Sequence, residues 1–454
     1  MTTIWARQAL LAKGWATDVA VNIAANGRIA SVLTGQPMFG TQVDVLVPAP
    51  ANCHSHAFQR ALAGLTEKRG RDVSDSFWTW RSLMYRFLDG ITPDHLEAIA
   101  AFVQMEMLEA GFGASIEFHY LHHQPDGTPY AALGEMSERI AAAAAASGIG
   151  LTLLPVHYQY AGCGRRPLEV RQGRFGNDPS RFARLLEAAG NGLTHLSSDA
   201  VLGVAPHSLR AVAAEDLVTT ASLAGAGPIH MHLAEQQAEV DEVLAAYGAR
   251  PVEWVLDHLD IDPRWCLIHC TQMQPHEIEG LARTGAVAGL CPLTEASLGD
   301  GIFDAVRWFD SRGAIAIGSD SNIRISLAEE LRQLDTSQRL RDHTRAALAS
   351  AEQSTGRRIF EAAAKGGAQA AGRGSGTIAQ GEWADLLALD MRHPDLEGLQ
   401  GDTVLDSFAF AGGNDMRRDV WSAGRHLVRD GRHVAKESIT AAYRAAVKSL
   451  REGL

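Results

Sequence analysis

The sequence predicts an α/β protein, a (β/α)8 TIM-type barrel with a small β-sandwich domain that is built from both termini. Three observations predict it. Over the middle of the chain, eight short apolar segments alternate with alanine-rich helical stretches. Both ends instead carry short strand-like segments separated by turn residues. Histidines or carboxylates follow nearly all of the eight apolar segments, at the strand ends where such a barrel has its active site.

The two ends of the chain have a similar texture. VAVNIAANGRIASVLTG alternates in polarity around a turn signal at Asn26-Gly27, and GTIAQGEWADLLALD and VWSAGRHLVRDGRHV are short strands broken by Gly and Asp. We therefore expect one small β domain from residues 1–47 plus 375–440, a barrel from residues 48–374, and a C-terminal helix from residues 441–454.

The middle of the chain supplies the barrel. In chain order, the eight expected strands occupy residues 46–54, 113–118, 150–156, 201–206, 228–233, 265–270, 286–292 and 314–320. Stretches such as SERIAAAAAASG, PSRFARLLEAAG and PHEIEGLARTG lie between them and predict helices. Eight such units over about 270 residues match a (β/α)8 barrel in number and length.

Bulk composition narrows the class of protein. Hydrophobic residues make up 46% and charged residues 21% of 454 residues, as is usual for a globular enzyme. The net charge of -12 disfavours binding to nucleic acid or an anionic membrane surface. No apolar run is long enough to span a membrane, and the first residues do not resemble a signal peptide.

The cysteines indicate a reducing compartment, which we expect to be the cytoplasm. They are scattered, odd in number and form no CxxC pair, which argues against a disulfide framework and a structural zinc knuckle. We expect each to be a small packing residue. These residues are Cys53, Cys163, Cys266, Cys270 and Cys291.

Polar residues at the expected strand ends predict an active site, because imidazoles and carboxylates are costly to bury without partners. In strand order they are His54 and His56; Glu117 and His119; His157; His207; His230, His232 and Glu235; His269; Glu295; and Asp320.

Four of these residues are expected to hold one divalent metal ion. His54 and His56 point to the same side of a strand, because side chains alternate with a period of two. His232 can add a third nitrogen and Asp320 an oxygen, a set that suits a catalytic zinc-type site. His230 competes with His232, but Glu235 three residues on favours His232. No lysine ends strand three or four, which favours a single ion over a carbamate-bridged pair.

The same array predicts hydrolysis. A divalent ion lowers the pKa of a water molecule bound to it to about 7. Asp320 can accept a proton from that water, and Glu235 can carry a proton to a leaving nitrogen. His269 would orient the hydroxide and stabilise developing charge. The expected reaction is attack on an sp² carbon that bears nitrogen.

Seven sequence blocks carry a family resemblance: HSHAFQRALAGL, FWTWRSLMY, EFHYLHH, APHSLRAV, HMHLAEQ, CPLTEASLGDG and GSDSN. They resemble the amidohydrolase superfamily, in its deaminase-like branch with one metal ion. The closer resemblance is to the formimidoylglutamate deiminase family, and it runs from about residue 48 to 340 and includes the terminal β segments. HxH and HxxE are superfamily-level signals, whereas HAFQRA, FWTWR and PHSLR are more specific.

The resemblance implies a zinc-dependent homodimer that converts N-formimidoyl-L-glutamate and water to N-formyl-L-glutamate and ammonia in histidine degradation. It also implies roles for individual residues. The metal ligands would be His54, His56, His232 and Asp320; the catalytic groups Glu235 and His269 with Asp320; and the substrate contacts Gln59, Arg81, Tyr120, His207 and Arg210.

The arginines support a dicarboxylate substrate independently, because guanidinium groups bind carboxylates and the protein is acidic overall. Arg81 lies between aromatic residues, where Trp78 and Trp80 are as well explained by packing as by substrate contact. Arg210 follows His207 by three residues. The group His119, His122 and His123 is a weak candidate for a second metal site, because no nearby carboxylate or cysteine completes it.

Two other function classes remain open. A deaminase of guanine, cytosine or an adenosine derivative would use the same metal chemistry, with aromatic and amide contacts in place of paired arginines. A barrel without catalysis, serving as a binding protein, would show gaps among the ligands or the acid–base groups, and the sequence shows none.

Overall fold

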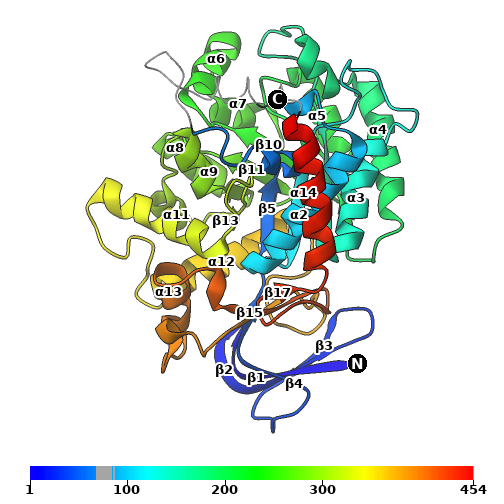
Figure 1. Ribbon diagram of the computed structural model, residues 1–454. Coiled ribbons are helices and arrows are strands. Elements are labelled where there is room, and N and C mark those ends of the chain that lie inside the picture. Colours follow the sequence, from blue (N-terminus) through cyan, green and yellow to red (C-terminus); the bar gives the residue numbers. More distant parts are fainter. Residues whose placement is uncertain (68–83, 85–86, 453–454) are drawn as a thin grey trace.

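A computed structural model describes residues 1–67, 84 and 87–452 of the chain. Its elements form a helix-rich body and, beside it, a curved sheet that contains both the first strands and strands from near the C-terminus (Figure 1).

The sheet is continuous and has the strand order β17-β16-β15-β14-β4-β1-β2-β3. Only β1 and β4 run parallel; the other neighbours are antiparallel. The strands are β1 (Thr2–Leu11), β2 (Gly14–Ile23), β3 (Ile29–Leu33), β4 (Thr41–Pro48), β14 (Leu386–Leu389), β15 (Arg417–Ser422), β16 (Arg425–Arg429) and β17 (Arg432–His433).

The strands from the two termini fit the expected small β domain, and they form one continuous sheet. Because β4 pairs with β1 on one side and with β14 on the other, the N-terminal and C-terminal strands join into one sheet. The sheet has a hydrophobic core of its own, which includes Ile4, Val21 and Trp421. The predicted turn at Asn26-Gly27 is present between β2 and β3, and Gly27 has a φ of 85°, a conformation that favours glycine.

The body contains two parallel sheets, with the orders β5-β6-β7-β8 and β10-β11-β12-β13. Short β9 also pairs with β7. Parallel bridges link the sheets at both edges, between Val204 and Ile229 and between Ser55 and Asp320. The strands are β5 (Ala51–Ser55), β6 (Ala114–His119), β7 (Gly150–His157), β8 (Val201–Leu202), β9 (Ala205–Pro206), β10 (Ile229–Leu233), β11 (Trp265–His269), β12 (Val287–Leu290) and β13 (Ala314–Ile317).

Every expected barrel segment contains a strand, but the first expected segment, residues 46–54, covers parts of two strands. Its beginning belongs to β4 in the terminal sheet, and β5 starts only at Ala51. Pro48 and Pro50 lie at the break, and neither can donate a backbone hydrogen bond to a ladder. The chain therefore crosses from the small sheet to the body at these prolines.

Helices follow the strands of the body and cover them (Figure 1). The three helical stretches singled out in the sequence are α3, α4 and α8. The helices are α2 (Pro93–Ala110), α3 (Glu135–Ser147), α4 (Pro179–Leu193), α5 (Ala214–Ser222), α6 (Gln237–Tyr247), α7 (Pro251–His258), α8 (Pro275–Ala282), α9 (Pro292–Leu298), α10 (Ala305–Asp310), α11 (Leu327–Asp342), α12 (Thr355–Ala370), α13 (Asp402–Phe410) and α14 (Lys436–Glu452).

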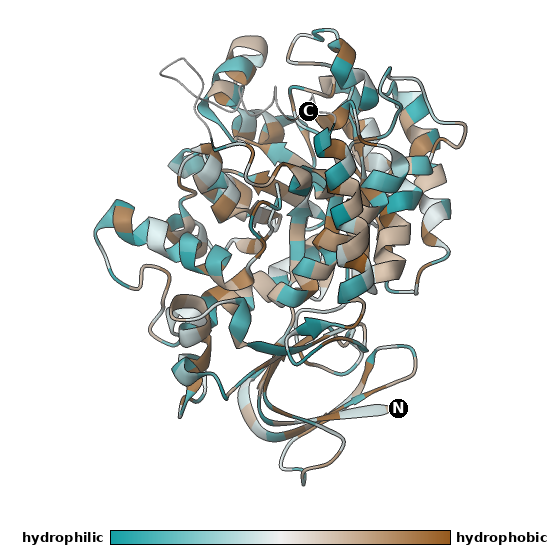
Figure 2. Ribbon diagram, in the orientation of Figure 1, coloured by the Kyte–Doolittle hydropathy of each residue, from teal (hydrophilic) through white to brown (hydrophobic). Residues whose placement is uncertain are grey.

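Helix α14 begins before residue 441, the expected start of the C-terminal helix. It packs on α2, where the Tyr443 and Phe102 rings stack with centroids 3.9 Å apart. Its buried residues include Ile439, Val447 and Leu450, and Figure 2 shows hydrophilic residues elsewhere along the same helix. This amphipathic pattern explains why the helix lies on the body.

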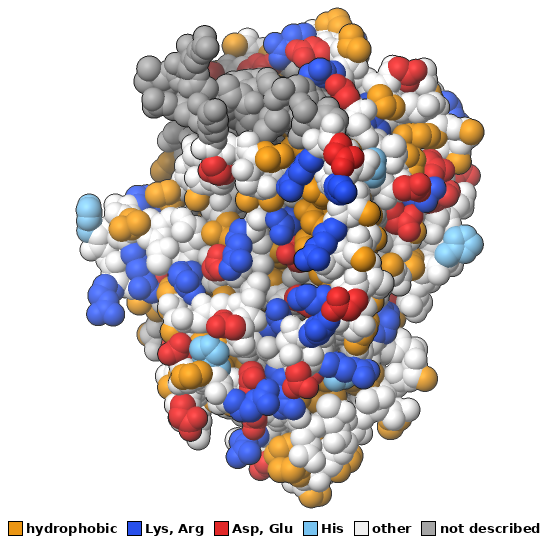
Figure 3. All heavy atoms as spheres, in the orientation of Figure 1, with side chains coloured by type: hydrophobic (Ala, Val, Ile, Leu, Met, Phe, Trp, Pro, Cys, Tyr) orange, Lys and Arg blue, Asp and Glu red, His pale blue; other side chains and the backbone are white. Residues whose placement is uncertain are grey.

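Two surface observations bear on partners. No helix among the described residues is long and apolar enough to cross a membrane. On the face shown in Figure 3, basic and acidic side chains are interspersed over the part of the chain that the structure describes.

A buried ionic cluster fastens the terminal sheet to the body. Arg373, which follows α12, donates to Asp199 at 3.1 Å and to Asp385 at 3.2 Å, and Arg425 of β16 donates to Asp199 at 2.7 Å. Burial acts to raise the pKa of Asp199, but the two arginines outweigh it and the pKa is lowered. Asp199 precedes β8 in the body, whereas Asp385 and Arg425 belong to the terminal sheet region, so the cluster spans both parts.

Replacing Arg373 with methionine is expected to lower the free energy of unfolding by about 3–5 kcal/mol, because it leaves buried Asp385 without its arginine and Asp199 with Arg425 alone. The control is Arg392→Met, since Arg392 pairs with Asp390 at the surface, where solvent screens the interaction and a much smaller loss is expected. Urea unfolding of both variants makes the comparison. Equal losses would contradict a special role for the cluster.

The cluster also predicts the direction of a pH effect. The folded pKa of Asp199 lies below its usual value, so its contribution to stability is present above the unfolded pKa and is lost as the pH falls through the folded pKa. The difference in stability between the wild-type protein and Arg373→Met should therefore shrink on acidification.

Candidate active site

Strand β5 presents the HxH pair, and Glu117 of β6 fixes the backbone around it. One Glu117 oxygen accepts from the Ser55 hydroxyl at 2.7 Å, and the other accepts from the Ala57 backbone N–H at 2.7 Å. Burial raises the pKa of Glu117 to about 8. Glu117 therefore braces the turn that carries His54 and His56, and it does not line the cavity described below.

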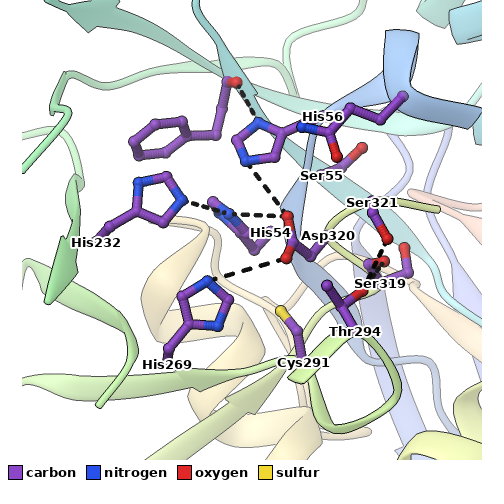
Figure 4. A network of polar contacts seen from close by, with 12 residues as sticks. His54, Ser55, His56, His232, His269, Cys291, Thr294, Ser319, Asp320 and Ser321 are labelled. Carbon is purple, nitrogen blue, oxygen red and sulfur yellow. Dashed lines mark hydrogen bonds and ion pairs between the residues drawn. The ribbon is translucent and has the colours of Figure 1, made fainter. Parts of the chain in front are cut away.

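The structure brings all four predicted metal ligands together. The Nε2 atoms of His54 and His232 are 3.1 Å apart. An Asp320 carboxylate oxygen lies 3.3 Å from His56 Nε2 and 3.6 Å from His54 Nε2. Figure 4 shows these imidazoles around the Asp320 carboxylate, with His54 and His56 at the end of β5 and His232 on β10. Strand order, period-two geometry and closure at the Ser55–Asp320 bridge account for the convergence.

The donor atoms suit a cation. His56 Nδ1 faces the Phe118 carbonyl oxygen at 3.0 Å, and His232 Nδ1 faces the His207 carbonyl oxygen at 3.2 Å. A carbonyl only accepts, so both Nδ1 atoms carry the hydrogen and both Nε2 lone pairs point inward. Burial lowers the pKa of His56 to about 3 and that of His232 well below its usual value. Neutral imidazoles and a carboxylate meeting at one point fit a divalent ion.

His230 and His232, the two competing ligand candidates on β10, point to different places. His230 Nε2 contacts the Ala370 carbonyl oxygen at 2.8 Å, away from the cluster. Two groups of described residues have ligand atoms close enough together for one ion: His54 with His56 and His232, and His54 with His269 and Asp320.

The histidines at 119, 122 and 123 belong to neither of these groups. His122 Nε2 contacts the Val156 carbonyl oxygen at 2.9 Å, and His123 Nε2 contacts Asn177 Oδ1 at 3.0 Å. These contacts explain His122 and His123 as buried structural histidines.

A polar network that the sequence reading missed supports Asp320. The Asn52 amide donates to the Ser319 hydroxyl at 2.7 Å, and this hydroxyl donates to Asn322 Oδ1 at 2.6 Å. The Asn322 amide in turn reaches Ser55 Oγ at 3.1 Å. Asp320 has a φ of 45°, an uncommon conformation for a residue with a side chain. The network thus holds β5 and the end of β13 together and fixes this backbone.

His269 lies among three carboxylates. Its Nδ1 is 3.2 Å from a Glu295 oxygen, and its Nε2 is 3.8 Å from Glu235 and 3.9 Å from Asp320. Burial lowers the pKa of His269, but the charge of Glu235 and the hydrogen bond to Glu295 outweigh it and raise the pKa to about 10. The raised pKa favours the protonated imidazole; its Nδ1 is within hydrogen-bond distance of Glu295, whereas the carboxylates near Nε2 are too far for hydrogen bonds. Glu295, noted in the sequence only as a strand-end residue, also accepts from the Cys291 backbone N–H at 2.9 Å.

A cavity of about 790 Å³, including its open mouth, leads to this cluster. Four of the five predicted substrate contacts line it: Gln59, Tyr120, His207 and Arg210. The Gln59 amide donates to the Tyr120 hydroxyl at 3.0 Å. Arg81, the fifth, lies outside the described residues, as do Trp78 and Trp80.

Arg210 brings a positive charge to the cavity. Its Nη2 is 3.9 Å from Glu239, while its buried Nε has no hydrogen-bond partner among the described residues. Burial acts to lower the pKa of Arg210, yet the charges of Glu239 and Glu235 raise it overall, so the guanidinium remains charged. A guanidinium with donors to spare is suited to an anionic group of a ligand.

Comparison with known proteins places the chain in a family. Residues 45–427 match the model of the amidohydrolase family. The chain belongs to that family. Residues 1–40 of this amidohydrolase match the model described as the N-terminal domain of formimidoylglutamate deiminase HutF.

The relatives agree with the assignment. The amidohydrolase is 45% identical to formimidoylglutamate deiminase of Pseudomonas aeruginosa over 98% of both chains. It is 47% identical to the crystal structure of an amidohydrolase from Brucella melitensis, with a TM-score of 0.96 over 99% of this chain and 100% of that one. A zinc-bound adenosine deaminase from Xanthomonas campestris shares the fold, at 21% identity and a TM-score of 0.82, over 99% of this chain and 98% of that one.

Proposed function

We propose that this amidohydrolase is a metal-dependent deiminase that converts N-formimidoyl-L-glutamate and water to N-formyl-L-glutamate and ammonia in histidine degradation. The observation that carries the proposal is the 45% identity to the Pseudomonas aeruginosa formimidoylglutamate deiminase, because it extends over 98% of both chains. It therefore includes every strand that contributes to the cavity and its metal-ligand cluster.

The proposed cofactor is one divalent ion, with zinc the first choice, held by His54, His56, His232 and Asp320. The inward Nε2 lone pairs and the nearby carboxylate support this set. A zinc-bound protein of the same fold agrees with it. When bound, such an ion supplies hydroxide near neutral pH by acidifying a water molecule.

Three side chains of the chain are proposed to move or stabilise charge. Asp320 accepts the proton released from the attacking water. Glu235, whose Oε1 is 3.8 Å from His269 Nε2, passes a proton to the leaving nitrogen so that it departs as ammonia. His269, protonated and braced by Glu295, donates toward the charge that develops in the tetrahedral adduct.

The architecture proposed for the body is a closed (β/α)8 barrel. The two parallel sheets and the bridges at both of their edges support it, with β8 and β9 counted as parts of one strand. Domain limits of 1–47 plus 375–440 for the small domain and 48–374 for the barrel belong to the same proposal. Cytoplasmic location and homodimeric assembly remain predictions from the sequence.

The main alternative is deamination of a heterocycle such as guanine, cytosine or an adenosine derivative. Aromatic side chains line the cavity, among them Tyr120, Tyr158 and Phe175, as such a substrate would need. Arg210 favours the dicarboxylate instead, since a partly buried cationic side chain suits a carboxylate better than a neutral base.

Replacing Arg210 with methionine separates these alternatives. We expect kcat/KM for N-formimidoyl-L-glutamate to fall by about 10- to 100-fold, because a hydrogen bond to a charged group is lost. Ammonia release is measured on this substrate and on guanine, cytosine and adenosine, with bound metal measured in parallel. The alternative would be favoured if the wild-type protein released ammonia faster from a heterocycle than from N-formimidoyl-L-glutamate and if Arg210→Met kept wild-type activity.

A further inference from the structure

Tyr158 lines the cavity but has no role in the proposed chemistry so far. It follows β7 directly and is 7% exposed. Its ring meets the His207 ring edge-on, with centroids 4.7 Å apart, and lies 5.7 Å from the Phe175 ring. These contacts fix the ring, and with it the position of the hydroxyl group.

Gln172 determines which way the Tyr158 hydroxyl can donate. The Glu169 backbone N–H donates to Gln172 Oε1 at 2.9 Å, so the orientation of the amide follows from chemistry: its oxygen faces Glu169. The other end of the amide is then the NH2 group, which donates to the Tyr158 hydroxyl oxygen at 3.2 Å. Gln172 is fully buried, which keeps water from competing for the amide.

The phenol therefore accepts from Gln172 and keeps its own hydrogen for another acceptor. Gln172 is the only hydrogen-bond partner of this hydroxyl among the residues that the structure describes. Tyr158 and Arg210 line the same cavity and lie close enough to interact electrostatically. A hydroxyl hydrogen beside a guanidinium with an unused donor forms a site for an anionic oxygen.

We propose that Tyr158 is a further substrate-binding residue, whose hydroxyl donates to the same substrate carboxylate that Arg210 binds, and that Gln172 is its positioning residue. The inference rests on the proposed function for the identity of the substrate as a dicarboxylate. It assigns specificity to a hydroxyl whose hydrogen is taken by no described residue, because a carboxylate accepts such a hydrogen and a methyl group does not.

The test compares Tyr158→Phe with Tyr160→Phe. Tyr160 is two residues away and does not line this cavity, so the control removes a phenol hydroxyl outside the site. Binding of glutarate, a plain dicarboxylate, is measured by titration calorimetry on metal-loaded protein. For Tyr158→Phe we expect Kd for glutarate and KM for N-formimidoyl-L-glutamate to rise about 10- to 100-fold, with kcat changed by less than about threefold. Tyr160→Phe should match the wild-type protein in all three.

A double substitution tests the positioning role. Gln172→Met keeps the Tyr158 phenol but removes the amide that orients its hydroxyl hydrogen, so Kd for glutarate should rise. The double variant Gln172→Met/Tyr158→Phe should have the same Kd as Tyr158→Phe alone. Additive effects would overturn the positioning role of Gln172.

The two proposals fail in different ways. An unchanged Kd for glutarate in Tyr158→Phe overturns the carboxylate contact, whether or not ammonia is released. If Tyr158→Phe binds glutarate more weakly but the wild-type protein releases no ammonia from N-formimidoyl-L-glutamate, the carboxylate contact is supported and the proposed substrate is overturned.

Discussion

Replacing His232 with alanine is expected to remove the bound metal ion and to slow ammonia release by about 10³-fold or more. His232 Nδ1 faces the His207 carbonyl oxygen, so the lone pair of His232 Nε2 points toward His54 Nε2, 3.1 Å away, where it can bind the metal ion. Without it, the remaining histidines and Asp320 offer too few donors for a tightly held divalent ion.

The matched control is His230→Gln, two residues earlier on β10. His230 Nε2 contacts the Ala370 carbonyl oxygen, and a glutamine amide can still offer a donor there. We expect this variant to keep one metal ion per chain. Elemental analysis of the purified proteins decides the matter: a fully loaded His232→Ala, or equal metal loss from both variants, would contradict the proposed ligand set.

Replacing Glu235 with glutamine should lower kcat by about 10²- to 10⁴-fold while metal content stays at the wild-type level. The amide has the shape of the carboxylate but carries no proton to the leaving nitrogen. Glu235 is 7% exposed, and its backbone N–H donates to Glu239 at 3.0 Å, so the substituted side chain should remain at the same position.

Asp241→Asn is the control for charge loss near this segment, because Asp241 lies on α6 and accepts from Gln237 at 2.8 Å at the surface. Steady-state kinetics on both variants, with KM compared separately, make the test. A loss in kcat of less than tenfold for Glu235→Gln would show that proton transfer does not pass through this carboxylate.

The candidate metal site could be predicted from the sequence because its logic is local. The period of two on a strand places His54 and His56 on one side, and the order of the strands brings His232 and Asp320 to the same end. Each of these residues lies at the end of an apolar run, so its position at a strand end can be recognised without any knowledge of tertiary contacts.

The supporting residues could not be predicted, because their partners are distant in the chain. Asn52 meets Ser319, and Glu117 meets Ser55, across separations that no sequence pattern encodes. Gln172 meets Tyr158 only because a loop returns over β7. Among these supporting residues, the sequence pointed only to Glu117, as a carboxylate at a strand end.

The fold class could be predicted from the sequence, but the connections between its two parts could be predicted less well. Periodicity identified the strands of the body, but it assigned the end of β4 and the start of β5 to one segment, although Pro48 ends β4 and Pro50 precedes β5. The terminal strands were recognised, whereas their union into one sheet depends on β4 pairing with β14 from the far end of the chain.

Product analysis tests the central claim most directly. Metal-loaded wild-type protein is incubated with N-formimidoyl-L-glutamate, and ammonia, formamide, N-formyl-L-glutamate and glutamate are quantified together. We predict ammonia and N-formyl-L-glutamate in equal amounts. Formamide with glutamate, or no product above the level of a metal-free control, would contradict the proposed reaction.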